Sequence, residues 1–279
     1  MDAAHQRITE DAMAAGSILN NISALGASRQ LGITSNNLDK TIRRLTTGKR
    51  INMASDDAAG LAIANRLSAD IRVSTQARRN AQDGLAYMQV ADGALEEVTA
   101  LLTRAAELAQ QAQTGTISNT NRLALDLEFQ VISDAIKNVA NNAVFNSQSV
   151  FRSDKIYVAV ASFENVEFTI GTMQGQIATS LNIKDATAAA AAQTKLDSLI
   201  QEVSMQRATI GSRMQYMNTI SNTLGIQVEN FTAAKSQIED ANIADEVISL
   251  TKFQILGQSG TSALAQSNQA AQLMLGLLR

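Results

Sequence analysis

The chain has 279 residues and a formal net charge of −3, and this acidic balance argues against a nucleic-acid partner. It has no cysteine and a single histidine, so we expect no metal site, no cofactor and no enzyme. It also lacks proline, which breaks helix interiors, and no stretch reaches the ~18 apolar residues of a membrane span, so we expect long helices and no membrane partner.

The first residues of the chain lack a helical apolar period. We expect residues 1–16 to be an extension without fixed structure, because Ile18, Ile22 and Leu25 are the first apolar residues at helical spacing. Met13 is an alternative translation start. No basic stretch followed by an apolar run occurs here, so we expect no cleaved secretory signal.

A second short apolar seam consists of Leu31, Leu38, Ile42 and Leu45. The period then fails over residues 46–60, where small and polar residues predict a loop.

A long helix is predicted over residues 58–113. Ser55 is expected to cap its N-terminus, with Asp56 and Asp57 in the positive first turn. One face of this helix carries the apolar residues Leu85, Met88, Leu95, Leu102 and Ala109.

Residues 114–121 predict a turn, and another helix follows it. Its apolar residues recur at steps of four and three, which is typical of a buried helix face. They are Leu125, Phe129, Ile132, Ile136, Val139 and Ala143.

Strand patterns occur only in the middle of the chain. Two short segments alternate apolar and other residues, and Glu164-Asn165 lies between them as a turn, so the sequence predicts one β-hairpin. A hairpin alone is marginal in water, so it must pack on the helices. The alternating residues are Ile156, Val158 and Val160, then Val166, Phe168 and Ile170.

The clearest heptad pattern lies in the C-terminal third. Steps of four and three run from Leu196 to Asn242, which predicts one helix over residues 196–245. A final seam follows, formed by Leu264, Ala271, Leu275 and Leu278. The thin apolar stripes at the two ends of the chain cannot bury themselves, so they pair with each other or with neighbouring molecules.

These elements predict a mostly α fold: an elongated bundle of long antiparallel coiled-coil helices with one small β-hairpin region at about residues 155–173. The helices before and after the hairpin are arranged symmetrically in the sequence. The outermost seams are the least able to form a core by themselves.

Ordered motifs near both ends of the chain resemble those of bacterial flagellin. The N-terminal motifs are RLTTGKRIN at 44–52 and DDAAGLAIA at 56–64, and Phe145-Asn146 follows later. The C-terminal motifs are IEDANIADE at 238–246 and the closing residues 277–279. The resemblance covers about 17–172 and 196–279. Lys49 stands where relatives often have leucine, a change not expected to alter the loop's role.

This resemblance implies a structural subunit that polymerises into the bacterial flagellar filament for swimming motility, secreted without a cleaved signal peptide. It implies that residues 17–57 and 246–279 pair as inner-tube helices, while residues 58–245 form a helical rod. The short middle of the chain resembles a short-form flagellin without outer variable domains. The implied partners are identical subunits, the flagellar export apparatus, a secretion chaperone at the C-terminal segment, the filament cap and hook-associated proteins.

The resemblance also implies two sets of functional residues. One set matches a surface that animal innate flagellin receptors recognise and that also serves axial packing: Arg104, Glu107, Leu108, Gln111 and Glu128. The other is the expected polymerisation seam: Ile18, Ile22, Leu25, Leu38, Ile42, Leu45, Leu264, Ala271, Leu275 and Leu278.

Two alternatives stay open from the sequence. A hook–filament junction protein shares the terminal motifs, although nearly continuous matches at both ends favour flagellin. A helical translocator or tip protein of a virulence secretion system has the same helical class, but the motif at 56–64 argues against it.

Overall fold

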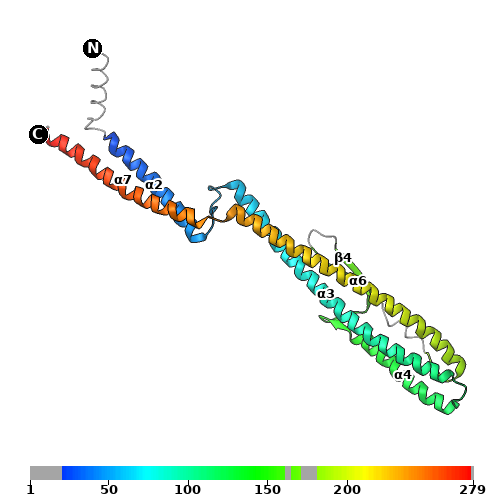
Figure 1. Cartoon of the computed structure of the whole chain (residues 1–279). Helices are drawn as coiled ribbons and strands as arrows, with labels where there is room; N and C mark the ends of the chain where they lie inside the picture. Colours follow the sequence, from blue (N-terminus) through cyan, green and yellow to red (C-terminus); the bar gives the residue numbers. More distant parts are fainter. Residues whose placement is uncertain (1–20, 161–164, 171–180, 278–279) are drawn as a thin grey trace. The chain divides into compact units, whose positions relative to one another are not determined.

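The computed structural model describes residues 21–160, 165–170 and 181–277 (Figure 1). Its helices are α2 (Ile22–Thr47), α3 (Ala58–Gln113), α4 (Asn119–Asn142), α6 (Ala186–Glu239) and α7 (Ile243–Leu277). Its strands are β1 (Val144–Phe145), β2 (Gln148–Ser149), β3 (Arg152–Val158) and β4 (Val166–Ile170). The expected mostly α class with a small β region is confirmed. The expected extension over residues 1–16 lies outside the described residues.

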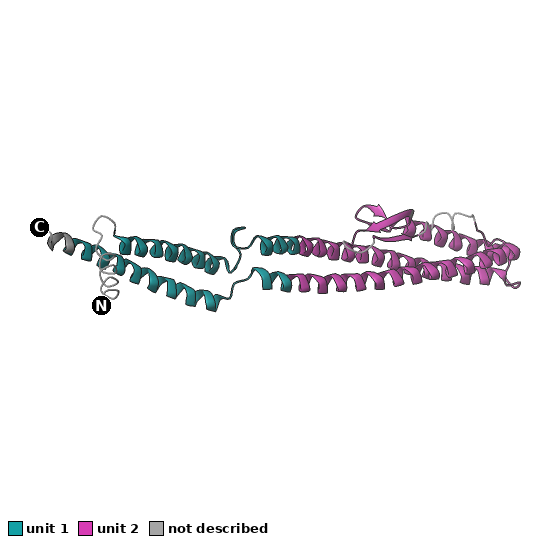
Figure 2. Ribbon diagram, turned by 90° about the horizontal axis from the view of Figure 1, so that it is seen from above, with its two compact units in different colours: residues 1–68, 233–279 teal, residues 69–232 magenta. Residues whose placement is uncertain are grey.

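The chain divides into two compact units (Figure 2). The first, unit 1, comprises Met1–Ser68 and Ala233–Arg279; the second, unit 2, comprises Ala69–Thr232. Unit 1 therefore holds α2 and α7 together with the adjoining ends of α3 and α6. Unit 2 holds α4, the strands and most of α3 and α6.

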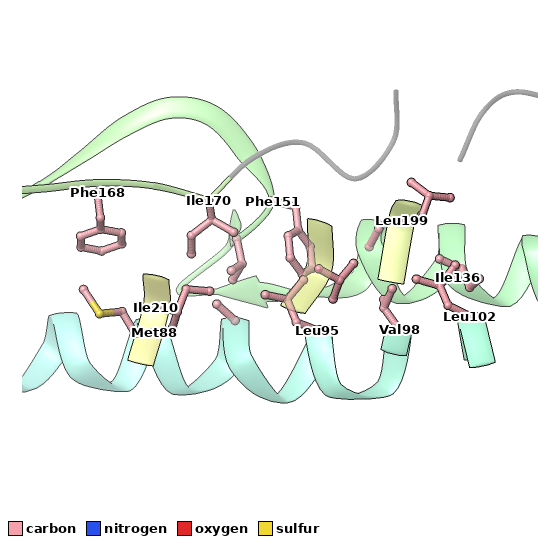
Figure 3. Packing of buried hydrophobic residues seen from close by; sticks show 14 of the residues in the cluster. Met88, Leu95, Val98, Leu102, Ile136, Phe151, Phe168, Ile170, Leu199 and Ile210 are labelled. Atoms are coloured by element: carbon pink, nitrogen blue, oxygen red, sulfur yellow. The ribbon is translucent and has the colours of Figure 1, made fainter. Parts of the chain in front are cut away.

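The core of unit 2 is built from heptad-spaced residues of α3 and α6 (Figure 3). On α3, Met88, Leu95 and Leu102 are each at most 1% exposed. On α6, the predicted seam is buried as well, at Leu196, Val203, Ile210, Met217 and Leu224. Helix α4 adds Phe129, Ile132 and Ile136 to the same cluster. Each fully buried side chain of this size contributes ~1.5–3 kcal/mol to folding. This burial stabilises α3 and α6 although they contain the helix-weakening residues Gly93 and Gly211.

The predicted pairing of the two strand segments is confirmed: β3 and β4 pair antiparallel, with Ile156 opposite Phe168 and Val158 opposite Val166. Glu164 of the expected turn and residues 171–173 of the expected region lie outside the described residues. The β3–β4 pair packs on α3 at Gly84, where a Cβ would meet Val158 Cγ2 at 3.0 Å. Tyr87 of α3 fixes the contact: its ring lies 5.8 Å from that of Phe168.

A second strand pair, β1–β2, was not predicted and corrects the expectation of a single hairpin. Its turn residues Asn146 and Ser147 have φ angles of 47° and 63°. Two positive φ angles are the geometry of a type I′ turn, which usually contains glycine. Phe145 anchors the pair, with its ring 5.7 Å from that of Tyr87.

A buried arginine organises the turn between α3 and α4. Arg122 is 8% exposed, and its guanidinium donates to the carbonyls of Ala112 at 2.8 Å and Thr114 at 3.0 Å. The first bond satisfies a carbonyl in the last turn of α3 that has no partner within the helix, and the second holds the turn that follows α3. Ser118 then caps α4 by accepting from the backbone N–H of Asn121.

One predicted helix boundary and one predicted cap are wrong. The helix expected over residues 196–245 ends at Glu239, and α7 begins at Ile243. The expected cap Ser55 is not used: the carboxylate of Asp57 accepts from the N–H of Gly60 at 2.8 Å and caps α3. Asp56 instead accepts from the N–H groups of Asn52 and Met53, which lowers the pKa of its carboxyl below the ordinary value.

Candidate functional site

Helices α2 and α7 lie side by side and antiparallel in unit 1 (Figure 1). The Asn21 side chain donates to the carbonyl of Ser267 at 3.1 Å near one end of the pair. Arg44 and Glu246 form a salt bridge of 3.1 Å near the other end. Between them, a Cβ placed on Gly260 would lie 3.3 Å from Leu31 Cδ1, so the missing side chain makes room for the leucine.

The seam between α2 and α7 is formed by small and polar residues as much as by leucines. These residues recur at steps of three and four and are buried or half-buried. On α2 they are Ala24, Ala27, Leu31, Thr34, Leu38, Thr41 and Leu45; on α7 they are Leu250, Phe253, Gly257, Gly260, Leu264, Ser267 and Ala271. Among the described residues, the two helices at the ends of the chain therefore pair with each other within one chain.

The expected polymerisation seam is therefore divided between two environments. Leu38, Leu45, Leu264 and Ala271 are half-buried in the α2–α7 seam. Ile22, Leu25 and Ile42 are not part of this seam, and they are 67%, 73% and 45% exposed. Ile18, Leu278 and the side chain of Leu275 lie outside the described residues.

Exposed apolar residues also lie on the outer side of each helix of the α2–α7 pair, and we call these two lines together the outer apolar face. On α7, Ile248, Ile255 and Leu273 are separated by 7 and 18 residues, close to whole numbers of helical turns, so they lie in one line. Their exposed fractions are 65%, 63% and 71%. On α2, Ile22 and Ile33 lie in a similar line, and the exposed Leu25 lies about one turn from Ile22 on the same outer side. A line of exposed apolar residues along a helix offers positions that a neighbouring molecule could bury.

The two breaks in the helical path of unit 1 are joined by backbone hydrogen bonds. Gly48 ends α2 with a φ of 69°, which turns the chain so that Lys49 pairs with Asp240 in an antiparallel bridge. Ala241 N–H donates to the Gly48 carbonyl at 3.0 Å, and Arg50 N–H donates to the Glu239 carbonyl at 2.6 Å. This cross-connection explains why α6 ends at Glu239.

Charged side chains surround the same breaks. The carboxylate of Glu239 contacts Lys49 Nζ at 2.6 Å and Lys235 Nζ at 3.6 Å. The Arg50 guanidinium donates to the carbonyl of Ile238 at 2.8 Å. Lys49 thus makes a specific ion pair, a role that its place in the sequence motif did not predict.

The expected receptor and axial-packing surface is only partly at the surface of unit 2. Arg104 pairs with Glu107 at 3.0 Å and with Glu128 of α4 at 2.7 Å, and these bonds raise the pKa of its guanidinium. Gln111 is exposed. The expectation that Leu108 lies on this surface is wrong, because Leu108 is 1% exposed and belongs to the core with Ala105 and Ala109.

Among residues 21–160, 165–170 and 181–277, no group of three or more acidic or histidine side chains could hold a metal ion. Within the same ranges, no helix is long and apolar enough to cross a membrane.

The comparisons with known proteins agree across the chain. The model of the bacterial flagellin N-terminal helical region matches residues 18–155, and that of the C-terminal helical region matches residues 193–278. A 30.7 kDa flagellar filament core protein of Treponema maltophilum is 34% identical over 94% of this chain and 99% of its own. A flagellin of Halalkalibacterium halodurans is 36% identical over the same shares.

A solved structure provides the corresponding match in three dimensions. The crystal structure of Bacillus cereus flagellin has a TM-score of 0.50 and 30% identity, covering 56% of this chain and 94% of that one. Because the two family models together match well over half of the chain, the chain belongs to the bacterial flagellin family.

Proposed function

We propose that this chain is a structural subunit that polymerises into the bacterial flagellar filament for swimming motility, and that it is not an enzyme. The observation that carries this proposal is the outer apolar face of the α2–α7 pair. Ile22, Leu25, Ile248, Ile255 and Leu273 are all more than half exposed in a single chain. Each such side chain that a neighbouring subunit buries would contribute up to ~1.5–3 kcal/mol to association.

The assembly follows from the two surfaces of the α2–α7 pair. The inward seam joins the two ends of one chain, whereas the outer apolar face is left for other copies. Contacts between unlike faces of identical subunits generate an open helix rather than a closed ring. We therefore assign residues 17–57 and 246–279 to an inner tube and residues 58–245 to a surrounding rod, with the family membership as support.

The partners follow from the same role. We propose secretion through the flagellar export apparatus without a cleaved signal, protection of the C-terminal segment by a secretion chaperone, and contact with the filament cap and hook-associated proteins at the two filament ends. The exposed apolar residues of α7 support the chaperone proposal, because such a surface invites aggregation until subunits bury it.

The Arg104 cluster is proposed to serve axial packing and recognition by an animal innate flagellin receptor. Arg104, Glu107, Gln111 and Glu128 present polar groups on adjoining faces of α3 and α4. Leu108 supports the surface from beneath. A receptor-reporter assay with soluble monomer tests the recognition half: signalling that falls with Arg104→Ala supports it, and a silent wild-type monomer at saturating dose refutes it.

Seeded polymerisation tests the filament role. The double variant Ile248→Ser/Ile255→Ser removes two apolar side chains from the outer apolar face, and Gln254→Ser/Gln258→Ser is the matched control on exposed positions of the same helix. We expect long filaments from wild type and control, and none from the first variant at equal concentration and equal helicity. Short caps or rings from the wild type would instead support a junction or tip protein.

A further inference from the structure

Glu239 lies where its own helix disfavours it. It is the last residue of α6, and the C-terminal end of a helix carries a partial negative charge that repels a carboxylate. Glu239 is also only 7% exposed, so water screens this repulsion poorly. A buried carboxylate needs cations and hydrogen-bond donors from elsewhere.

The compensation comes largely from the other side of the paired breaks. Lys49 Nζ lies 2.6 Å from the Glu239 carboxylate, and Lys235 from the preceding turn of α6 lies 3.6 Å away. The N–H of Arg50 and its guanidinium bind the carbonyls of Glu239 and Ile238. The end of α6 is thus stabilised by the loop that follows α2.

The α2–α7 pair needs such a constraint because its seam defines register weakly. Thr34 and Thr41 alternate with leucines on α2, while Gly257, Gly260 and Ser267 lie on α7. Seams of small and polar residues fit nearly as well when one helix slides by a turn, unlike seams with large apolar side chains that fill specific holes. Fixed contacts at the ends must therefore set the register.

We propose that Lys49 and Glu239 form a charge clamp that sets the register of the α2–α7 pair, so that the outer apolar face is presented in the form that polymerises. The clamp acts at the point where both helical paths break, adjacent to the Arg44–Glu246 salt bridge that begins the pair. Glu239 and Lys49 are positioning residues for assembly. This inference rests on the proposed filament function.

The register can be measured directly because the chain contains no cysteine. A Cβ on Gly260 would lie 3.9 Å from the Cβ of Leu31, within the range that a disulfide requires. Leu31→Cys/Gly260→Cys therefore reports the native register, and Leu31→Cys/Gly257→Cys reports a slip of about one turn. Oxidation rates of the two pairs in dilute monomer give the ratio of native to slipped register.

The clamp variants are Lys49→Met, which keeps an unbranched side chain without charge, and Glu239→Gln, which keeps the shape of the glutamate. Lys49→Arg is the conservative variant, and Asp134→Asn removes an exposed ion pair on α4 as the control. We expect the native-to-slipped ratio to fall about tenfold or more in Lys49→Met, with a matching rise in the critical concentration for polymerisation, because the buried Glu239 carboxylate loses its nearest cation. Glu239→Gln removes the same ion pair without leaving a buried charge, so its ratio should fall as well, but less. Lys49→Arg and Asp134→Asn should retain wild-type values.

If the native-to-slipped ratio is unchanged in both Lys49→Met and Glu239→Gln, the proposed clamp is wrong, whether or not these variants polymerise. If the wild type forms no filaments at all, the proposed function fails, while the register ratio in the monomer still decides the clamp. A loss of polymerisation with an unchanged ratio would also contradict it, because the clamp acts through register.

Discussion

Leu108→Ala distinguishes a core role for this residue from a surface role. Leu108 is 1% exposed and belongs to the same buried cluster as Leu102 and Phe129. Removing a buried leucine costs the lost transfer free energy together with the cavity left behind, about 3 kcal/mol within a usual range of 2–5. In a domain of ~150–250 residues, a loss of this size lowers the melting temperature by roughly 6–12 °C.

The assay is thermal unfolding of the monomer followed by far-ultraviolet circular dichroism. Leu108→Met is the matched control, because a swap that conserves volume usually costs less than ~1.5 kcal/mol. Arg104→Ala is the surface comparison: its ion pairs with Glu107 and Glu128 are exposed, so the melting temperature should hardly change. A Leu108→Ala melting curve that matches that of Arg104→Ala would refute the core assignment, and any lost motility would then reflect a surface contact.

Two further predictions concern ionisable groups whose pKa values are shifted. The lowered pKa of Asp56 means that its stabilisation of the loop over residues 48–57 is present above the ordinary aspartate value of 3.8 and is lost as pH falls through the lower folded value. Hydrogen exchange at the Asn52 and Met53 amides should therefore show protection that collapses in that acidic window, and Asp56→Ala, which has no side-chain acceptor, should lack the protection even at neutral pH. Burial raises the pKa of Tyr87 above its ordinary value of 10.0. An ultraviolet titration of the tyrosines should therefore contain a late step at high pH, in which the Tyr87 phenol ionises, and Tyr87→Phe should remove that step. A titration unchanged by Tyr87→Phe would contradict the packing of the hairpins on α3.

The long elements could be predicted from the sequence because one repeated pattern determines each of them. Met88, Leu95 and Leu102 recur every seven residues, and burying them needs only a partner stripe, which α6 supplies at Val203 and Ile210. A pattern repeated over many helical turns is still recognisable where single residues depart from it. The observed bounds of α3 therefore agree with the predicted ones. The family resemblance was readable for a similar reason, because its motifs occur in order near both ends of the chain.

The features that were missed depend on contacts between distant residues. The apolar period continues through Ile238, and only the bond from Arg50 N–H to the Glu239 carbonyl shows why α6 ends there. Leu108 lies one turn from Arg104 but faces the core, because a step of four residues rotates a position about 40° around the helix. The β1–β2 turn uses Asn146 and Ser147 without glycine, so the usual turn signal was absent.

A reconstruction of the polymerised wild-type protein by electron cryomicroscopy tests the filament assignment most directly. We expect filaments of uniform width in which α2 and α7 pair as in the single chain, with Leu31 against Gly260. In these filaments Ile22, Leu25, Ile248 and Ile255 should be buried against neighbouring subunits. Filaments that leave these four side chains exposed, or a protein that stays monomeric under seeding, would contradict it.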